Sequence, residues 1–269
     1  MTIQEKLQKL DEWYAEGNLA QAEKQLKNWI GDADLEFEKE AKLTFYNELM
    51  GLYRTTGRAK QGAELAEQAL SLIEELGAAG TVSHGTTLLN AATVCARAQM
   101  YDRSLELYAQ AADIFAAQGL QNSYQMAGLF NNMSRIYGEK GDDKKALSFL
   151  EEALRIISAQ DDCEEELATT WVNISYALMK LGRLEEADEY IRKAIIYYAS
   201  PKGCRDPHYA AALAASAELE TRRGNYEDAL DSYEKALTET KNRFGYNDYC
   251  KLLEQNIAIV KKKMEEKQS

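Results

Sequence analysis

Residues 126–166 have the sequence MAGLFNNMSRIYGEKGDDKKALSFLEEALRIISAQDDCEEE, and their pattern predicts one helical hairpin. Phe130 and Tyr137 belong to an apolar face with helical spacing, and the pattern breaks at Gly141. A second apolar face follows the glycine and begins at Ala146. Because Ala146 is small, we expect the two helices to approach each other closely at this position.

The same pattern recurs along the chain with a period of 40 to 42 residues. Small residues occupy the equivalent positions Ala22, Gly62, Ser104, Ala146, Ala187 and Ala229. Glycines lie five residues before most of them, at Gly17, Gly57, Gly141, Gly182 and Gly224. Self-similarity at a fixed period of this length predicts a solenoid of stacked helical pairs.

Three segments resemble a known repeat family: GDDKKALSFLEEAL at 141–154, GRLEEADEYIRKAI at 182–195 and GNYEDALDSYEKAL at 224–237. They share a glycine and two alanines in one register, and they resemble the turn and second helix of tetratricopeptide repeats. The period exceeds the usual repeat of about 34 residues by about eight, which resembles the longer repeats of the kinesin light chain type. The resemblance implies an all-α fold, a right-handed α-α superhelix of about six helical hairpins plus a C-terminal capping helix.

The resemblance covers nearly the whole chain, so we expect a single solenoid domain over residues 1–269. The predicted units are 1–42, 43–84, 85–125, 126–166, 167–209 and 210–250, with a cap helix over 251–266. Two residues depart from the pattern: Gln99 replaces a turn glycine, and Glu220 stands at a position expected to be apolar.

The connections VSHGTT and RDPHYA, at 82–87 and 205–210, each precede a first helix and resemble linkers of the same subgroup. In the second connection we expect Asp206 to be the helix N-cap and Pro207 the first helical residue.

Composition excludes several classes of function. The chain has 32 basic and 44 acidic residues, and the net charge of −12 opposes non-specific binding to nucleic acid or to an anionic membrane. No signal peptide is recognisable, and no apolar run approaches the roughly 18 residues of a membrane span. The four cysteines form no CxxC pair, which favours a reducing, cytoplasmic compartment.

The family resemblance implies that first helices line a concave groove. Opposite the apolar stripe of each first helix, Asn90, Asn132 and Asn173 recur at intervals of 42 and 41 residues. An asparagine amide can bind both the N–H and the C=O of an extended peptide, although such amides can instead bond neighbouring helices and support stacking. Basic residues near this face favour an acidic segment or a free C-terminal carboxylate. The predicted groove residues are Asn90, Thr93, Arg97, Asn132, Arg135, Asn173, Tyr176, Lys180, Arg54 and Arg222.

Catalytic and metal chemistry find little support in the sequence. His84 and His208 occupy equivalent connections, which favours a structural role for both. Stacked loops could bring Cys163, Cys204 and His208 together, but the three residues form no recognised motif. The acidic run over 161–166 lacks the spacing of a calcium loop and favours the start of the next helix through its dipole. We therefore expect no catalytic residue, no metal site and no cofactor.

These observations predict a non-catalytic adaptor that binds a protein or peptide in the groove, without nucleic acid or membrane as a partner. One alternative is a structural module that assembles with itself, and homo-oligomerisation is left open. Another is a peptide-sensing regulator without its own effector domain, because the repeats are expected to fill the chain.

Overall fold

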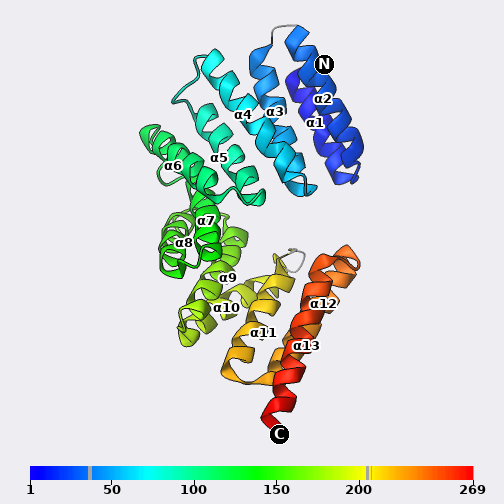
Figure 1. Cartoon of the computed structure of the whole chain (residues 1–269), viewed down its shortest axis with the longest axis vertical. Coiled ribbons are helices and arrows are strands. Elements are labelled where there is room, and N and C mark those ends of the chain that lie inside the picture. Colours follow the sequence, from blue (N-terminus) through cyan, green and yellow to red (C-terminus); the bar gives the residue numbers. More distant parts are fainter. Residues whose placement is uncertain (36–37, 204–205, 207, 269) are drawn as a thin grey trace. The chain divides into compact units, whose positions relative to one another are not determined.

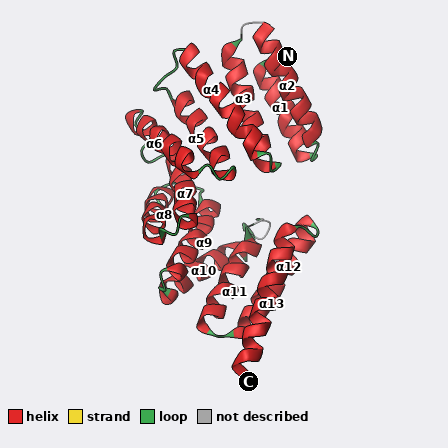
Figure 2. Cartoon of the chain, in the orientation of Figure 1, coloured by secondary structure: helices red, strands yellow, loops and turns green. Residues whose placement is uncertain are grey.

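The computed structural model describes residues 1–35, 38–203, 206 and 208–268, which form thirteen helices and no strand (Figures 1 and 2). The first twelve helices form six hairpins, and the last one follows them, so the prediction of an all-α solenoid is confirmed. The helices are α1 (Ile3–Ala15), α2 (Leu19–Leu35), α3 (Lys39–Thr55), α4 (Ala59–Glu75), α5 (Val82–Arg97), α6 (Tyr101–Ala117), α7 (Tyr124–Glu139), α8 (Asp143–Ile157), α9 (Glu164–Lys180), α10 (Leu184–Tyr198), α11 (Tyr209–Arg223), α12 (Tyr226–Phe244) and α13 (Asp248–Gln268). None of these described helices combines the length and the apolar character that crossing a bilayer requires.

The chain divides into two compact units, Met1–Leu129 and Phe130–Ser269, with the boundary inside α7. We call them unit 1 and unit 2 and describe each by itself. The single domain over residues 1–269 stays a prediction.

The turn between the two helices of a hairpin has a left-handed residue in every repeat. The five predicted turn glycines have φ between +71° and +79°. Gln99, which stands at the equivalent turn without a glycine, takes the same conformation at φ +61°. The left-handed conformation costs about 1 kcal/mol or more for a residue that has a side chain. The turn therefore keeps this conformation at Gln99 despite a local cost in conformational free energy.

Small residues lie where the two helices of each hairpin meet, as expected from the repeat pattern. Ala22, Ala187 and Ala229 are fully buried. Ser104 is the polar member of this set, and its hydroxyl donates a hydrogen bond to the backbone oxygen of Ala92 at 2.7 Å. The hydroxyl is therefore satisfied inside the hairpin and does not disturb the close approach.

The first and last helices are anchored by apolar contacts. In unit 1 the rings of Trp13 and Trp29 stack at 6.1 Å, and Trp29 packs on Phe45 of the next hairpin at 5.5 Å. In unit 2 Leu253 and Val260 of α13 are buried in the terminal core cluster. The helix α13 thus covers the last hairpin, as expected of a C-terminal capping helix.

The start of α11 differs from its prediction. The helix begins at Tyr209, with His208 at the N-cap, so it starts two residues later than a cap at Asp206 implies. The Asp206 carboxylate still accepts a hydrogen bond from the backbone N–H of His208 at 2.7 Å. Pro207, the predicted first helical residue, lies outside the described residues.

A polar bridge joins the first helices α3 and α5 in unit 1. Asn47 Nδ2 donates to Thr87 Oγ1 at 3.1 Å, and Asn47 Oδ1 accepts from Asn90 Nδ2 at 2.8 Å. Thr87 and Asn90 lie three residues apart on one face of α5, so a single amide contacts both. Thr87 is fully buried, which makes its hydrogen bond to Asn47 part of the packing between repeats.

Unit 2 repeats this bridge between α7 and α9. Asn131 Nδ2 donates to Thr170 Oγ1 at 3.1 Å, and Asn131 Oδ1 accepts from Asn173 Nδ2 at 3.3 Å. We call these two arrangements the asparagine bridges. They show that the asparagine amides support repeat stacking, which the sequence left as an alternative to ligand binding.

We predict that Asn47→Ala lowers the free energy of unfolding by about 2 kcal/mol, because the buried Thr87 hydroxyl loses this donor. Urea denaturation followed by circular dichroism measures the change. Asn132→Ala is the matched control: Asn132 is half-buried and takes no part in a bridge, so we expect a change within about 0.5 kcal/mol. Equal losses in the two variants would contradict the structural role of the bridge.

We also predict that Gly85→Ala destabilises the chain by about 1–3 kcal/mol, because an added Cβ would lie 2.7 Å from Cε1 of the fully buried Phe115. The control is Gly51→Ala in α3, where nothing lies within 4 Å of the added Cβ. This control should gain about 0.5–1 kcal/mol from helix propensity. Thermal unfolding should therefore shift in opposite directions for the two variants, and a shift in the same direction would refute the packing argument.

Candidate functional site

First helices form the closely packed layer within each unit. Contacts between helices two apart in sequence join α3 to α5 in unit 1 and α9 to α11 in unit 2. Both contacts are between first helices, as expected for the inner layer of a solenoid. The face of this layer that points away from the second helices is the candidate binding face.

The predicted asparagines lie on first helices, and two of them contact the preceding first helix of their own unit. Asn90 and Asn173 are half-buried, and each donates one hydrogen bond to an asparagine of the preceding first helix. The partner of Asn173 is Asn131 and not the predicted Asn132. Asn47 and Asn131 were missed by sequence reasoning, although their offsets of 43 and 42 residues from Asn90 and Asn173 carry the same periodic signal.

Thr93 does not reach the surface, so its predicted position in the groove is wrong. It is only 6% exposed. Its hydroxyl bonds to the backbone oxygen of Leu89 at 2.8 Å and to the Tyr108 hydroxyl at 3.0 Å. The side chain is small enough for α6 to close over it.

Two predicted basic residues are engaged at helix ends in unit 2. Lys180 Nζ donates to the backbone oxygen of Gly138, in the last turn of α7, at 3.2 Å. Arg222 donates to the backbone oxygen of Met179, in the last turn of α9, at 3.0 Å. Each of these carbonyl oxygens also accepts a hydrogen bond from the backbone N–H of the following turn glycine, Gly141 or Gly182, at 3.2 Å. The cations add a second donor and interact favourably with the negative end of the helix dipole.

The other predicted basic residues are exposed. Arg54 and Arg97, in unit 1, form no ion pair within the described part of the chain. Arg135, in unit 2, is exposed but engaged in an interaction of its own. Among the predicted basic residues, Arg54 and Arg97 are therefore the ones in unit 1 that remain available to a carboxylate.

Tyr176 lies in a group of aromatic and charged side chains in unit 2. Its side chain is 36% exposed, yet the surrounding protein raises its pKa, first through burial and then through Tyr249, Tyr233 and Glu218. Because Tyr176 is open to solvent and still closely surrounded by protein, we infer that this part of the surface is concave. We call Tyr176, Glu218, Tyr233 and Tyr249 the tyrosine hollow.

Hydrogen bonds order the hollow. The Tyr233 hydroxyl donates to Glu218 Oε2 at 3.3 Å, and Arg222 Nε donates to Glu218 Oε1 at 2.7 Å. Burial raises the pKa of Tyr249. Tyr176 and Tyr249 therefore stay uncharged beyond neutral pH, and each offers an aromatic surface and a hydroxyl group.

The inner layer of unit 1 has an acidic counterpart of this hollow. Burial, and next the charge of Asp11, raise the pKa of Glu48. Burial, and next the charges of Glu48 and Asp11, raise the pKa of Tyr14 to about 12. These groups oppose the binding of an acidic ligand at this end of unit 1.

The thiols of Cys95 and Cys163 show no activation. Burial raises the pKa of the Cys95 thiol, and burial followed by nearby carboxylates raises the pKa of the Cys163 thiol. A nucleophilic thiol needs the opposite shift. Cys204, the third member of the group considered with Cys163 and His208, lies outside the described residues.

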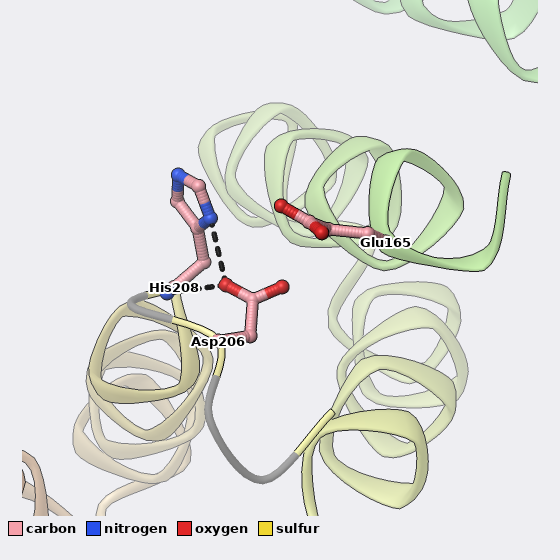
Figure 3. Close-up of side chains that lie close together, drawn as sticks. All are labelled: Glu165, Asp206 and His208. Atoms are coloured by element: carbon pink, nitrogen blue, oxygen red, sulfur yellow. Dashed lines mark hydrogen bonds and ion pairs between the residues drawn. The ribbon is translucent and has the colours of Figure 1, made fainter. Parts of the chain in front are cut away.

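His208 lies beside two carboxylates (Figure 3). Its Nδ1 is 2.9 Å from Asp206 Oδ1, and Glu165 at the start of α9 completes a group whose ligand atoms all lie within 4.8 Å of one another. The equivalent His84 has a different environment, because its Nδ1 accepts a hydrogen bond from the backbone N–H of Gly80 at 3.1 Å.

Comparison with known proteins gives matches in sequence and in structure. The model of the tetratricopeptide repeat family matches residues 83–159 and 166–238. The kinesin light chain-related protein 2 of Arabidopsis thaliana is 23% identical over 144 residues, which are 53% of this chain and 22% of that protein. The chain thus spans about a quarter or less of the length of such relatives.

Two solved structures share the fold. BtubC (BKLC) from P. vanneervenii has a TM-score of 0.69 and 19% identity, over 85% of this chain and 93% of that one. NprR in complex with its cognate peptide NprX has a TM-score of 0.68 and 18% identity, over 94% of this chain and 71% of that one. Together with the family match over more than half of the residues, these findings establish that the chain belongs to the tetratricopeptide repeat family and has repeats of the kinesin light chain type.

Proposed function

We propose that this chain is a non-catalytic binding module that holds a segment of peptide or protein on the first-helix face of unit 2. The observation that carries the proposal is Tyr176, a large aromatic side chain that stays open to solvent at the base of the tyrosine hollow. Aromatic side chains in concave surfaces contribute strongly to binding, because they bury a large area with little loss of side-chain entropy.

Asn173, three residues before Tyr176, supplies hydrogen-bonding capacity next to the hollow. Its Nδ2 donates to Asn131, while its Oδ1 accepts no hydrogen bond from the residues that the structure describes. A half-buried amide oxygen and a second amide hydrogen are therefore available to a peptide backbone. Recognition of this kind is independent of the side chains of the ligand, which Tyr176 and Tyr249 would select by shape.

The finer preference for an acidic segment or a free C-terminal carboxylate rests on fewer residues than the sequence implied. Lys180 and Arg222 already bond helix ends. We therefore do not assign this preference to the face of unit 2; the exposed Arg54 and Arg97 of unit 1 can bind carboxylates in a bidentate manner separately from that face.

Similar proteins support binding as the general role. NprR, which shares the fold, is known in complex with a peptide. The described cysteines Cys95, Cys163 and Cys250 are free thiols, which supports a cytoplasmic location.

The test is selection of the purified full chain against a random library of short peptides with free C-termini. We expect an enriched motif and a loss of affinity of about tenfold or more in Tyr176→Ala, because this substitution removes the aromatic base of the hollow. Tyr246→Ala is the matched control. Tyr246 is 58% exposed and donates a hydrogen bond to Glu254, which is not a member of the tyrosine hollow, so its removal should leave the affinity unchanged.

Two results would contradict the proposal. Equal loss of affinity in both tyrosine variants would place the ligand elsewhere. No enrichment by the wild-type chain would exclude linear peptides, and a mass that rises with protein concentration would then favour self-assembly.

A further inference from the structure

The group formed by Glu165, Asp206 and His208 joins two neighbouring repeats of unit 2. Glu165 lies in the first turn of α9, and Asp206 and His208 lie in the connection that leads into α11. One oxygen of each carboxylate and one ring nitrogen of His208 lie within 4.8 Å of one another. In Figure 3 the Glu165 carboxylate points across toward His208 and Asp206.

Asp206 carries the observation that points to a ligand. Its side chain is 4% exposed, and Oδ1 accepts from the backbone N–H of His208 and lies 2.9 Å from Nδ1 of that residue. The other oxygen, Oδ2, is buried and has no hydrogen-bond partner in the described part of the chain. A buried carboxylate oxygen without a partner costs free energy, so helix capping through Oδ1 alone does not explain the residue.

The charges of the described residues around the group favour a cation. Lys202, the lysine of the same connection, is engaged with Glu164 at 2.9 Å. Burial first, and then the charges of Asp206 and Glu165, raise the pKa of Tyr197, which indicates a negative potential at this place. Two carboxylates that approach each other without a cation between them repel one another.

Comparison of the two histidines separates this group from the ordinary repeat connection. His84 occupies the equivalent position before α5, and its Nδ1 is used by the backbone N–H of Gly80. Burial lowers the pKa of His84. His208 is instead half exposed and faces carboxylates, so the structural role of His84 does not extend to it.

We propose that Glu165, Asp206 and His208 bind a divalent transition-metal ion of the zinc class. The ring nitrogen favours Zn²⁺ and its neighbours in the first transition row over Ca²⁺, which takes six to eight oxygen ligands. Ligands of one zinc ion, each about 2.0–2.2 Å from it, lie at most about 4.4 Å apart. The distance of 2.9 Å between Asp206 Oδ1 and His208 Nδ1 is already within this limit. Rotation of the exposed Glu165 side chain can bring its carboxylate from within 4.8 Å to within the same limit.

The ion would fasten the start of α9 to the connection before α11 and leave coordination positions for water. A metal ion that binds the folded chain and not the unfolded chain raises the free energy of unfolding. The increase grows with the logarithm of the ratio of metal concentration to dissociation constant. The proposed site therefore predicts both a binding isotherm and a rise in melting temperature, neither of which depends on the peptide ligand.

The experiment titrates the chelator-treated full chain with Zn²⁺ by isothermal calorimetry and records thermal unfolding with and without Zn²⁺. We expect one ion per chain and a higher melting temperature. Glu165→Gln, His208→Gln and Asp206→Asn should each weaken binding by about tenfold or more and remove most of the thermal shift. Glu165 is exposed, so its variant keeps the test valid if Asp206→Asn folds poorly.

Matched controls are Glu164→Gln, which changes the neighbouring carboxylate paired with Lys202, and His84→Gln, which removes the other histidine. Both should bind Zn²⁺ as the wild type does. The proposal is overturned if Zn²⁺ does not bind, if binding survives in Glu165→Gln and His208→Gln, or if Ca²⁺ and Mg²⁺ bind as tightly as Zn²⁺.

Discussion

Each helical hairpin of this chain is too small to bury its own apolar face, so the rest of the structure depends on the stacking of one hairpin on the next. In unit 2 a single core cluster includes side chains from α8 to α11. The left-handed turn and the small residue that follows it bring the two helices of a hairpin together at a fixed place. Stacking then fixes which side chains face the next repeat.

Polar groups on the first helices form hydrogen bonds between stacked repeats. A half-buried amide needs partners, and the asparagine bridges provide them from the neighbouring first helix. The last carbonyl groups of a helix also need donors, and in unit 2 a basic residue about 42 positions later supplies one. Lys180 serves α7, Arg222 serves α9, and Lys267 serves α11 through Gly224. Residues that the sequence suggests for ligand binding thus hold neighbouring repeats together.

The fold could be predicted because period, turn glycines and small residues repeat the same physical requirement six times. At Gln99 the turn keeps its left-handed conformation although the glycine that predicts this turn in the other repeats is absent. The candidate site was harder to predict. Thr93 and Tyr176 both follow a groove asparagine by three residues, yet a small side chain is covered by α6 and a large one stays exposed. Helical spacing gives the direction of a side chain but not the depth of the packing around it.

The group formed by Glu165, Asp206 and His208 could not be predicted from motifs. Asp206 and His208 follow Glu165 by 41 and 43 residues, and they come close to it only because the repeats stack. The acidic residues of 161–166 were interpreted as partners of the helix dipole. That interpretation explains why a carboxylate stands in the first turn of α9, but it gives no reason for a second, buried carboxylate beside it.

Stacking and ligand binding do not exclude one another at Asn173, because an amide can donate two hydrogen bonds and accept two, and the bridge uses one donor. A peptide that donates to Oδ1 would leave the bond to Asn131 in place. It would also polarise the amide and strengthen the hydrogen bond that Asn173 donates. A ligand bound at this position would therefore stabilise the contact between α7 and α9. Binding would then tighten the stacking of the repeats that form the binding face.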